Sequence, residues 1–224
     1  MQLIEKKDSL YTLYFSKKYQ KKESINFQIL DVNVDEKQPG FPVEILLKIS
    51  EKCQIAYEII VFDIYRLVAE KNLPGKSCCS LCSRLKTFIL YDSARKFGCN
   101  KIALGYHREY AMETFMMNIF FSGQFGSMPG HYKIQTEDLY VIRPLFSVQE
   151  DWIKDFVQTQ EWPIISCNLC RSQEYLKSRE TKESLIELQQ RYPKLKYTAF
   201  RSLHNRKSKF LFDKKLWGTD IPGI

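Results

Sequence analysis

Apolar residues along this chain alternate between the two periods that distinguish strands from helices. Short β-rich runs predict strands at 26–34, 56–62, 101–104 and 140–142. Segments with helical spacing separate these runs, at 9–20, 43–53, 64–71, 83–97, 108–121, 147–160 and 173–190. This order predicts an α/β fold, in which a parallel sheet is flanked by helices.

The predicted element ends indicate where a site should form. Asp8 or Ser9 is expected to cap the first helix, and Ser147 to Glu150 reads as a capping box. Residues 122–132 are interpreted as a Gly-rich loop. In parallel sheets ligands bind beyond the carboxyl ends of the strands. The segments that follow Val34, Phe62 and Leu104 are therefore expected to line the site.

Length and composition fit one globular domain with an appendage. The chain has 224 residues, of which 44% are hydrophobic, so a full core can form. It lacks an apolar run of the roughly 20 residues that a membrane helix needs, and its start is not a signal peptide. We therefore expect a cytoplasmic protein without membrane contact. The predicted units are an α/β domain over 1–170 and a basic helical extension over 171–224.

The net charge of +8 is concentrated near the C-terminus. Residues 171–224 contain 13 Lys or Arg and 6 Asp or Glu, with aromatic residues interleaved. This combination is typical of proteins that contact a polyanion, and RNA fits it best. Charge alone fits a solvated surface equally well.

Two Cys-x-x-Cys pairs carry the strongest chemical signal, Cys79 with Cys82 and Cys167 with Cys170. Two intervening residues let both sulfurs of a pair point at one metal ion or cluster. In a reducing cytosol such thiols are more often ligands than disulfides. The pairs predict one composite site that joins distant segments, and their spacing fits a Cys₄ zinc site or an iron–sulfur cluster. Cys78 is interpreted as a bystander, because adjacent thiols cannot both reach one metal without strain.

Five motifs follow one another along the chain: NVDEKQPGFP at 33–42, CSLCSRL at 79–85, KIALG at 101–105, IRPL at 142–145 and PIISCNLC at 163–170. Together they resemble the tRNA 2-thiocytidine synthetases (TtcA family) of the PP-loop ATP pyrophosphatase superfamily. The resemblance covers most of residues 8–192. It implies a PP-loop (HUP-like, Rossmann-type) fold whose first strand is missing here.

The resemblance also implies an activity, the ATP-dependent transfer of sulfur to C2 of cytidine 32 in the tRNA anticodon loop. ATP and Mg²⁺ serve to adenylate the C2 oxygen, which is otherwise a poor leaving group. Sulfur held on a [4Fe–4S] cluster then displaces AMP. Three cysteine ligands leave one iron free to carry this sulfur. The implied ligands are Cys79, Cys82 and Cys170, with Cys167 as the alternative to Cys170.

The resemblance further implies residues for the nucleotide. Lys7, Asp8 and Ser9 match the end of the family's Ser-Gly-Gly-Lys-Asp-Ser phosphate loop. Asp35, at a strand end, is expected to face the adenosine, and His107 to face the nucleotide or the substrate. The implied partners are tRNA and a cysteine desulfurase-type sulfur donor, with a homodimer as a further expectation.

The chain departs from the family pattern at three places. Ile4, Glu5 and Lys6 stand where the phosphate loop has Ser-Gly-Gly, Tyr110 replaces an acid suited to Mg²⁺, and Arg171 replaces a glycine. Glycines let the backbone approach phosphate oxygens, so the grip on ATP is expected to be weakened. Three interpretations stay open: a shortened or decayed member, a different way of binding phosphate, and a start codon upstream of Met1. The last of these would explain the missing strand, but not Glu5 or Tyr110. Two rival functions stay open, an RNA-binding relative that keeps the cluster without ATP chemistry, and a zinc-stapled binding module.

Overall fold

The computed structural model describes residues 6–22, 26–37, 43–70, 78–135, 138–160, 162, 173–205, 207 and 211. The helices are α1 (Lys6–Lys22), α2 (Val43–Lys52), α3 (Ile64–Glu70), α4 (Cys78–Lys96), α5 (Arg108–Met117), the π-helix η1 (Asn118–Ser122), α6 (Glu150–Thr159), α7 (Gln173–Arg191) and α8 (Leu195–Ser202). The strands are β1 (Leu30–Asp35), β2 (Ala56–Val61), β3 (Lys101–Ala103), β4 (His131–Lys133) and β5 (Tyr140–Ile142). Among these helices, none is long and apolar enough to span a bilayer.

The α/β fold predicted from the alternating pattern is confirmed. β1 pairs in parallel with β2, from Leu30 opposite Ala56 to Asp35 opposite Val61. β3 pairs in parallel with β5, and β4 adds to β5 as an antiparallel edge. The described strands thus form two small sheets, ordered β1-β2 and β3-β5-β4. β4 lies partly in the segment predicted as a loop, because its sequence His-Tyr-Lys has no apolar run and its outer residues are exposed.

One apolar core joins the two sheets. Val34 of β1, Leu90 of α4, Ile102 of β3 and Val141 of β5 belong to the same buried cluster. α4 contacts both β1 and β3, so this helix fixes the two sheets relative to each other. The first Cys-x-x-Cys pair lies in the first turns of α4, within the helix that was predicted to begin only at Ser83.

A second core holds α6 against α1. Its buried residues Leu145, Ile153 and Val157 pack against Tyr11 of α1 and against Trp162. Tyr11 also meets Phe156 of α6 edge to face, with 5.1 Å between the ring centroids. This packing brings the beginnings of α1 and α6 together, although they are far apart in sequence.

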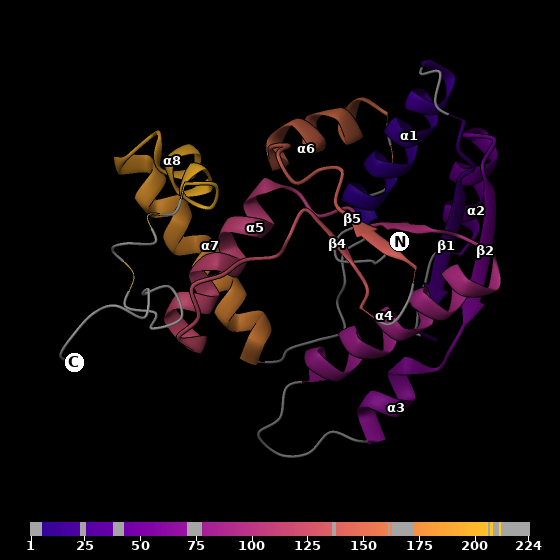
Figure 1. Ribbon diagram of the computed structural model, residues 1–224, viewed down its shortest axis with the longest axis horizontal. Coiled ribbons are helices and arrows are strands. Elements are labelled where there is room, and N and C mark those ends of the chain that lie inside the picture. The colour runs from indigo at the N-terminus through magenta and orange to yellow at the C-terminus, as the bar shows by residue number, and fades with distance from the viewer. Residues whose placement is uncertain are drawn as a thin grey trace, which may run out of the picture.

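The C-terminal helices lie on the far side of α5 from β1 and β2 (Figure 1). Both α7 and α8 contact α5. The division of the chain at residue 170 falls outside the described residues and stays a prediction.

Candidate functional site

The beginning of α1 lies directly against the end of β3. A Cβ added at Gly105 would stand 2.7 Å from the backbone C and O of Asp8 and 2.9 Å from the backbone N of Ser9. Only glycine permits such an approach of two backbones. Because of this contact, Lys7, Asp8 and Ser9 are buried at the carboxyl end of β3, where the sheet topology predicts a ligand site. α1 begins at Lys6, so Asp8 and Ser9 lie within its first turn, and the prediction that one of them caps the helix is wrong.

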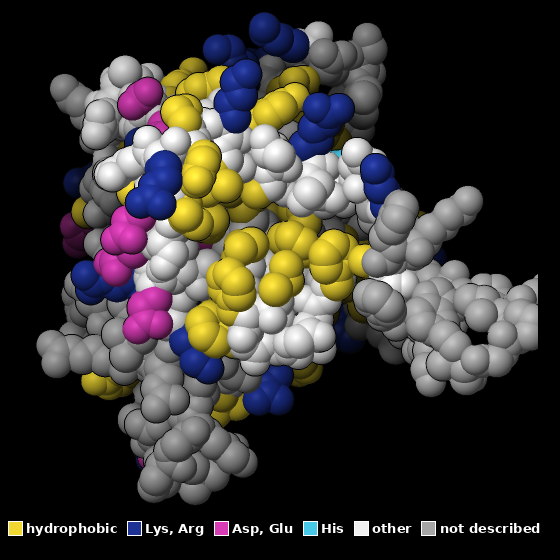
Figure 2. Space-filling view, turned by 90° about the vertical axis from the view of Figure 1, so that its left-hand side faces the viewer, with side chains coloured by type: hydrophobic (Ala, Val, Ile, Leu, Met, Phe, Trp, Pro, Cys, Tyr) yellow, Lys and Arg dark blue, Asp and Glu magenta, His cyan; other side chains and the backbone are white. Residues whose placement is uncertain are grey.

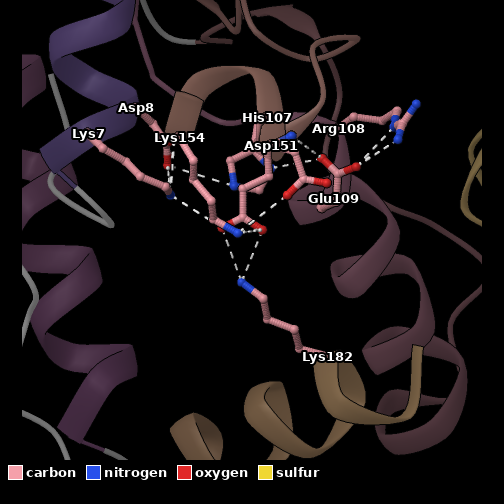
Figure 3. A network of polar contacts seen from close by, with 9 residues as sticks. Lys7, Asp8, His107, Arg108, Glu109, Asp151, Lys154 and Lys182 are labelled. Atoms are coloured by element: carbon pink, nitrogen blue, oxygen red, sulfur yellow. Dashed lines mark hydrogen bonds and ion pairs between the residues drawn. The ribbon is translucent and has the colours of Figure 1, made fainter. Parts of the chain in front are cut away.

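His107 lies between two carboxylates (Figure 3). Its Nε2 is 3.8 Å from Oδ2 of Asp8, and its Nδ1 is 3.3 Å from Oε2 of Glu109. The His107 ring is only 1% exposed. The structure therefore brings together four of the residues that the resemblance implied for the nucleotide, namely Lys7, Asp8, Ser9 and His107.

Glu150, the first residue of α6, gathers three ammonium groups in the same place (Figure 3). Its Oε1 is 3.4 Å from Nζ of Lys7, and its Oε2 is 3.2 Å from Nζ of Lys154 and 3.3 Å from Nζ of Lys182. Burial raises the pKa of Glu150, but the positive charges of Lys182, Lys7, His107 and Lys154 outweigh this and lower it to about 2. The carboxylate is therefore charged throughout the physiological pH range.

Glu109 ties α5 to α6. Its Oε2 accepts a hydrogen bond of 2.9 Å from the backbone N–H of Glu150, and its Oε1 accepts one of 2.8 Å from Arg108. Burial raises the pKa of Glu109, yet the contacts with His107, the Glu150 backbone and Arg108 together lower it to about 2. The predicted capping box at Ser147–Glu150 is wrong, because the N-cap is Gln149 and its own side chain makes no capping hydrogen bond.

The pKa of Glu113, one turn further along α5, is raised, whereas the pKa values of Glu109 and Glu150 are lowered. Burial raises its pKa to about 7, and the charges of Lys182 and His107 offset this only in part. Glu150 and Glu109 add to the increase, because a third negative charge beside them is unfavourable. This side chain therefore holds its proton up to about neutral pH.

We expect the Glu113→Gln variant to be more stable than the parent protein above neutral pH. The folded state keeps the Glu113 proton up to a pH of about 7, whereas an unfolded chain releases it near 4.5. Stability of the parent should therefore fall as the pH rises between these values, and a glutamine cannot cause this loss. The difference at pH 8 should approach about 3 kcal/mol. Urea denaturation at both ends of the range measures it.

Glu183→Gln, on the exposed surface of α7, serves as the control for that experiment. The free energy of unfolding of this variant should change with pH as that of the parent protein does. Parallel pH profiles for the parent and Glu113→Gln would contradict the raised pKa.

A second polar cluster lies at the end of β1. The thiol of Cys82 donates to Oε2 of Glu36 over 3.7 Å, and Nζ of Lys86 is 2.5 Å from Oε1 of the same carboxylate. Glu36 and Lys86 are both buried, and Cys82 is half-buried. Neighbouring Asp35 accepts the backbone N–H of Lys37 at 2.8 Å, so its carboxylate stabilises its own turn. Its expected contact with adenosine stays a prediction.

Of the three implied cluster ligands, only Cys82 has its side chain within the described part of the structure. Cys79 lies in the first turn of α4, but its side chain is outside the described part of the structure. Cys167 and Cys170 fall wholly outside the described residues. Among the side chains that are described, no three His, Cys, Asp or Glu residues are grouped to hold a metal ion.

No role was predicted from the sequence for five residues of the two clusters, namely Glu36, Lys86, Glu113, Lys154 and Lys182. Their neighbours in sequence give no signal, since each contact joins different elements or lies on an ordinary helix face. Glu150 was assigned from the sequence only to a helix cap.

Comparison with known proteins shows the family. No protein-family model matches the chain. It is 41% identical over 218 residues to the tRNA-cytidine(32) 2-sulfurtransferase of Ralstonia pickettii, covering 97% of this chain and 69% of the relative. It is 41% identical over 211 residues to the protein of the same name from Tolumonas auensis, covering 94% and 70%.

A solved structure shows the same fold. The U34-tRNA thiolase NcsA from Methanococcus maripaludis, determined with its [4Fe-4S] cluster, superimposes with a TM-score of 0.69 at 21% identity. The match covers 90% of this chain and 70% of the thiolase. From the identity to its relatives over nearly the whole length, this chain belongs to the family of the tRNA-cytidine(32) 2-sulfurtransferases.

Proposed function

We propose that this chain transfers sulfur to C2 of cytidine 32 in tRNA, in a reaction that consumes ATP. The identity of 41% to the named sulfurtransferases over nearly the whole chain supports the reaction class. The observation that carries the proposal is the packing of Asp8 and Ser9 on Gly105. It keeps the matched end of the phosphate loop at the carboxyl edge of the sheet, beside His107, even though the two glycines of that loop are replaced.

The first turn of α1 offers a place for the phosphates. The N-terminus of a helix attracts anions through its unpaired N–H groups and its dipole, and α1 has 17 residues. Lys7 shares the carboxylate of Glu150 with Lys154 and Lys182. Lys7 can therefore exchange Glu150 for a phosphate oxygen without leaving that carboxylate unpaired. This arrangement supports a phosphate grip that depends on side chains more than on glycine N–H groups.

One carboxylate lies where a magnesium ion could meet the phosphates. Asp8 is beside Lys7 in the first turn of α1, and Mg²⁺ is commonly held by one or two carboxylates together with substrate phosphates. Glu109 lies at the opposite nitrogen of the His107 ring, and its two oxygens accept hydrogen bonds from the Glu150 backbone and Arg108. Tyr110 stands where the family has a second acid, and its ring packs on His107 with 4.5 Å between the centroids. The site thus exchanges a metal ligand for a contact that fixes the histidine ring.

The proposed sulfur transfer depends on cysteine side chains. Cys79 and Cys82 are three residues apart on α4, a spacing that places them on one helix face. We propose that both bind a [4Fe–4S] cluster with Cys170 as the third ligand, and that a cysteine desulfurase-type enzyme supplies the sulfur. When bound, ATP would activate the C2 oxygen as a leaving group and the cluster would carry the sulfur. Lys86 and Glu36 hold the position of the Cys82 side chain.

An RNA-binding relative without ATP chemistry is the second candidate. The ion pair of Lys7 with Asp8 favours it, because the 3.2 Å contact neutralises the lysine that the phosphates need. The tyrosine at position 110 favours it as well, since it removes a carboxylate. The two candidates differ in whether the protein consumes ATP.

A thiolation assay separates them. Protein purified without oxygen is incubated with a tRNA transcript, sulfide, Mg²⁺ and ATP, and the digested nucleosides are analysed by mass spectrometry. We expect 2-thiocytidine and an equal amount of AMP. A transcript with uridine at position 32, and a reaction with an ATP analogue whose bridge between the α- and β-phosphates cannot be cleaved, should yield neither product.

The outcome of that assay decides between three cases. Product and AMP together support the sulfurtransferase. Binding of tRNA without either product leaves the RNA-binding relative. Absence of tRNA binding excludes both, and a colourless protein that contains zinc would indicate the zinc-stapled module.

A further inference from the structure

Three phenylalanine rings are exposed just beyond the end of α5. Phe120 is 59% exposed, Phe121 47% and Phe125 62%. We call these three residues the aromatic platform. Large apolar side chains grouped on a surface commonly mark a contact site, whereas isolated ones carry little meaning.

The backbone holds the platform in a fixed shape. Asn118 donates its side-chain N–H to the carbonyl of Gly126 at 2.8 Å, and its own carbonyl accepts the backbone N–H of Gln124 at 3.0 Å. The hydroxyl of Ser127 donates to the carbonyl of Ala111 on α5. Gly123 has a φ of 61°, a conformation that suits glycine, and it lets the chain turn back after η1. The rings are thus presented by an ordered turn.

One ring of the platform is anchored from below. Phe125 meets the buried Phe115 edge to face, with 5.1 Å between the centroids. This contact leaves much of Phe125 exposed while restricting its motion. A π-helix such as η1 is rare and frequently accompanies a functional site.

One cation lies against the platform, and α7 and α8 together carry more positive than negative charge. Nζ of Lys177 on α7 lies 4.9 Å from the centre of the Phe121 ring. Seven Lys or Arg and three Asp or Glu occur among residues 177–205, which cover most of α7 and all of α8. Figure 2 faces the side on which these helices lie, and there hydrophobic side chains gather, with Lys and Arg side chains spread around them and Asp and Glu side chains along the left-hand edge.

We propose that the aromatic platform stacks unpaired bases of the RNA substrate, and that Lys177 and the cations of α7 and α8 contact its phosphates. This inference rests on the proposed function. Exposed rings among positive charges are the chemistry that binds unpaired nucleotides, whose bases stack and whose backbone is anionic. A protein partner fits less well, because lysine is depleted at the centres of protein–protein contacts.

The length of α5 separates the aromatic platform from His107. The ten residues of α5 extend about 15 Å, from Arg108 beside His107 to the start of η1. A base stacked on the platform is therefore not the base that reacts beside His107. The platform would hold a different unpaired nucleotide and so set which one reaches the site.

The test uses leucine, which keeps an apolar side chain but has no aromatic face. The full-length Phe120→Leu/Phe125→Leu variant and the parent protein are titrated with two labelled RNAs, a stem-loop and a fully paired duplex of equal length. Fluorescence anisotropy measures both affinities over a range of salt concentrations. We expect the variant to bind the stem-loop at least tenfold more weakly and the duplex equally well.

Three further measurements make the result specific. The slope of the logarithm of affinity against the logarithm of salt concentration should be the same for the leucine variant and the parent. The Lys177→Ala variant should reduce the magnitude of this slope by about one. Phe88→Leu, which changes an exposed ring on α4, should bind both RNAs as the parent does. The Phe120→Trp/Phe125→Trp variant should restore stem-loop affinity, since tryptophan also stacks.

Several outcomes would overturn the inference, and one would overturn only the proposed function. Equal stem-loop affinity of parent and leucine variant would exclude stacking, and equal weakening for both RNAs would indicate general damage. A parent that is dimeric and a variant that is monomeric would identify the platform as a contact between copies. If the parent thiolates tRNA but the leucine variant binds normally, only this inference fails. If the parent shows ring-dependent stem-loop binding without thiolation, only the proposed function fails.

Discussion

Replacing Gly105 by alanine should lower the free energy of unfolding by about 1–3 kcal/mol and abolish ATP binding at the same time. The added methyl group would stand 2.7 Å from the backbone C and O of Asp8. Backbone atoms cannot rotate away as a side chain can, so the beginning of α1 must shift. That shift would displace Lys7, Asp8 and Ser9 together, and with them the place proposed for the phosphates.

Gly126 offers a matched control on the same molecule. A methyl group added there meets no atom within 4 Å, and the residue does not have a positive φ. Gly126→Ala should therefore change stability by no more than about 0.5 kcal/mol. Urea denaturation measures the stability of both variants, and isothermal titration calorimetry measures ATP binding. If Gly105→Ala behaves like Gly126→Ala, then α1 does not pack on β3 as described.

The apolar pattern predicted the elements that bury a face and missed two that do not. The strands β1, β2, β3 and β5 and the helices from α1 to α7 were all expected, with shifts at their ends. β3 and β5 have only three residues each, but each has a buried apolar residue at its centre. β4 has exposed residues on both sides of Tyr132, and no residue of α8 is fully buried, so neither element shows an apolar face. η1 was read as the end of α5, because one extra residue per turn leaves the apolar spacing almost unchanged.

The residues of the candidate site likewise include some that were predicted from the sequence and some that were not. Motif residues that are consecutive in sequence, such as Lys7, Asp8 and Ser9, were predicted from the sequence. Glu150 was assigned to a helix cap by a local rule, yet its carboxylate binds Lys7 and Lys182 from two other helices. A local rule cannot anticipate this, because the packing of α6 on α1 decides which groups the carboxylate meets.

The substitution at Tyr110 illustrates how a lost ligand can become a packing residue. The sequence indicated only that an acid was missing. In the structure the Tyr110 ring lies 4.5 Å from the His107 ring and 5.6 Å from the Tyr106 ring, measured between centroids. Aromatic contacts of this kind stabilise by about 0.5–1.5 kcal/mol. The tyrosine therefore holds His107 between Asp8 and Glu109, where an acid would have added a third negative charge.

Replacing Cys82 by alanine should remove the iron and the thiolation activity together. A [4Fe–4S] cluster held by three cysteines has no spare protein ligand, so the loss of one thiolate should prevent stable binding. Iron and acid-labile sulfide per chain should fall to near zero, and the visible absorption of the cluster should disappear. ATP binding should persist, because Cys82 contacts Glu36 at the end of β1, whereas the proposed phosphate site is at the start of α1.

Cys99→Ala provides the matched control for Cys82→Ala. Cys99 is also half-buried, lies just after α4 and packs on the same core, so its removal costs a similar amount of apolar contact. This variant should keep its iron and its activity. Cys170→Ala should behave like Cys82→Ala, and Cys167→Ala like Cys99→Ala, if Cys170 is the third ligand. The reverse result for the last two variants would exchange their roles, whereas iron retained in Cys82→Ala would exclude Cys82 as a ligand of the cluster.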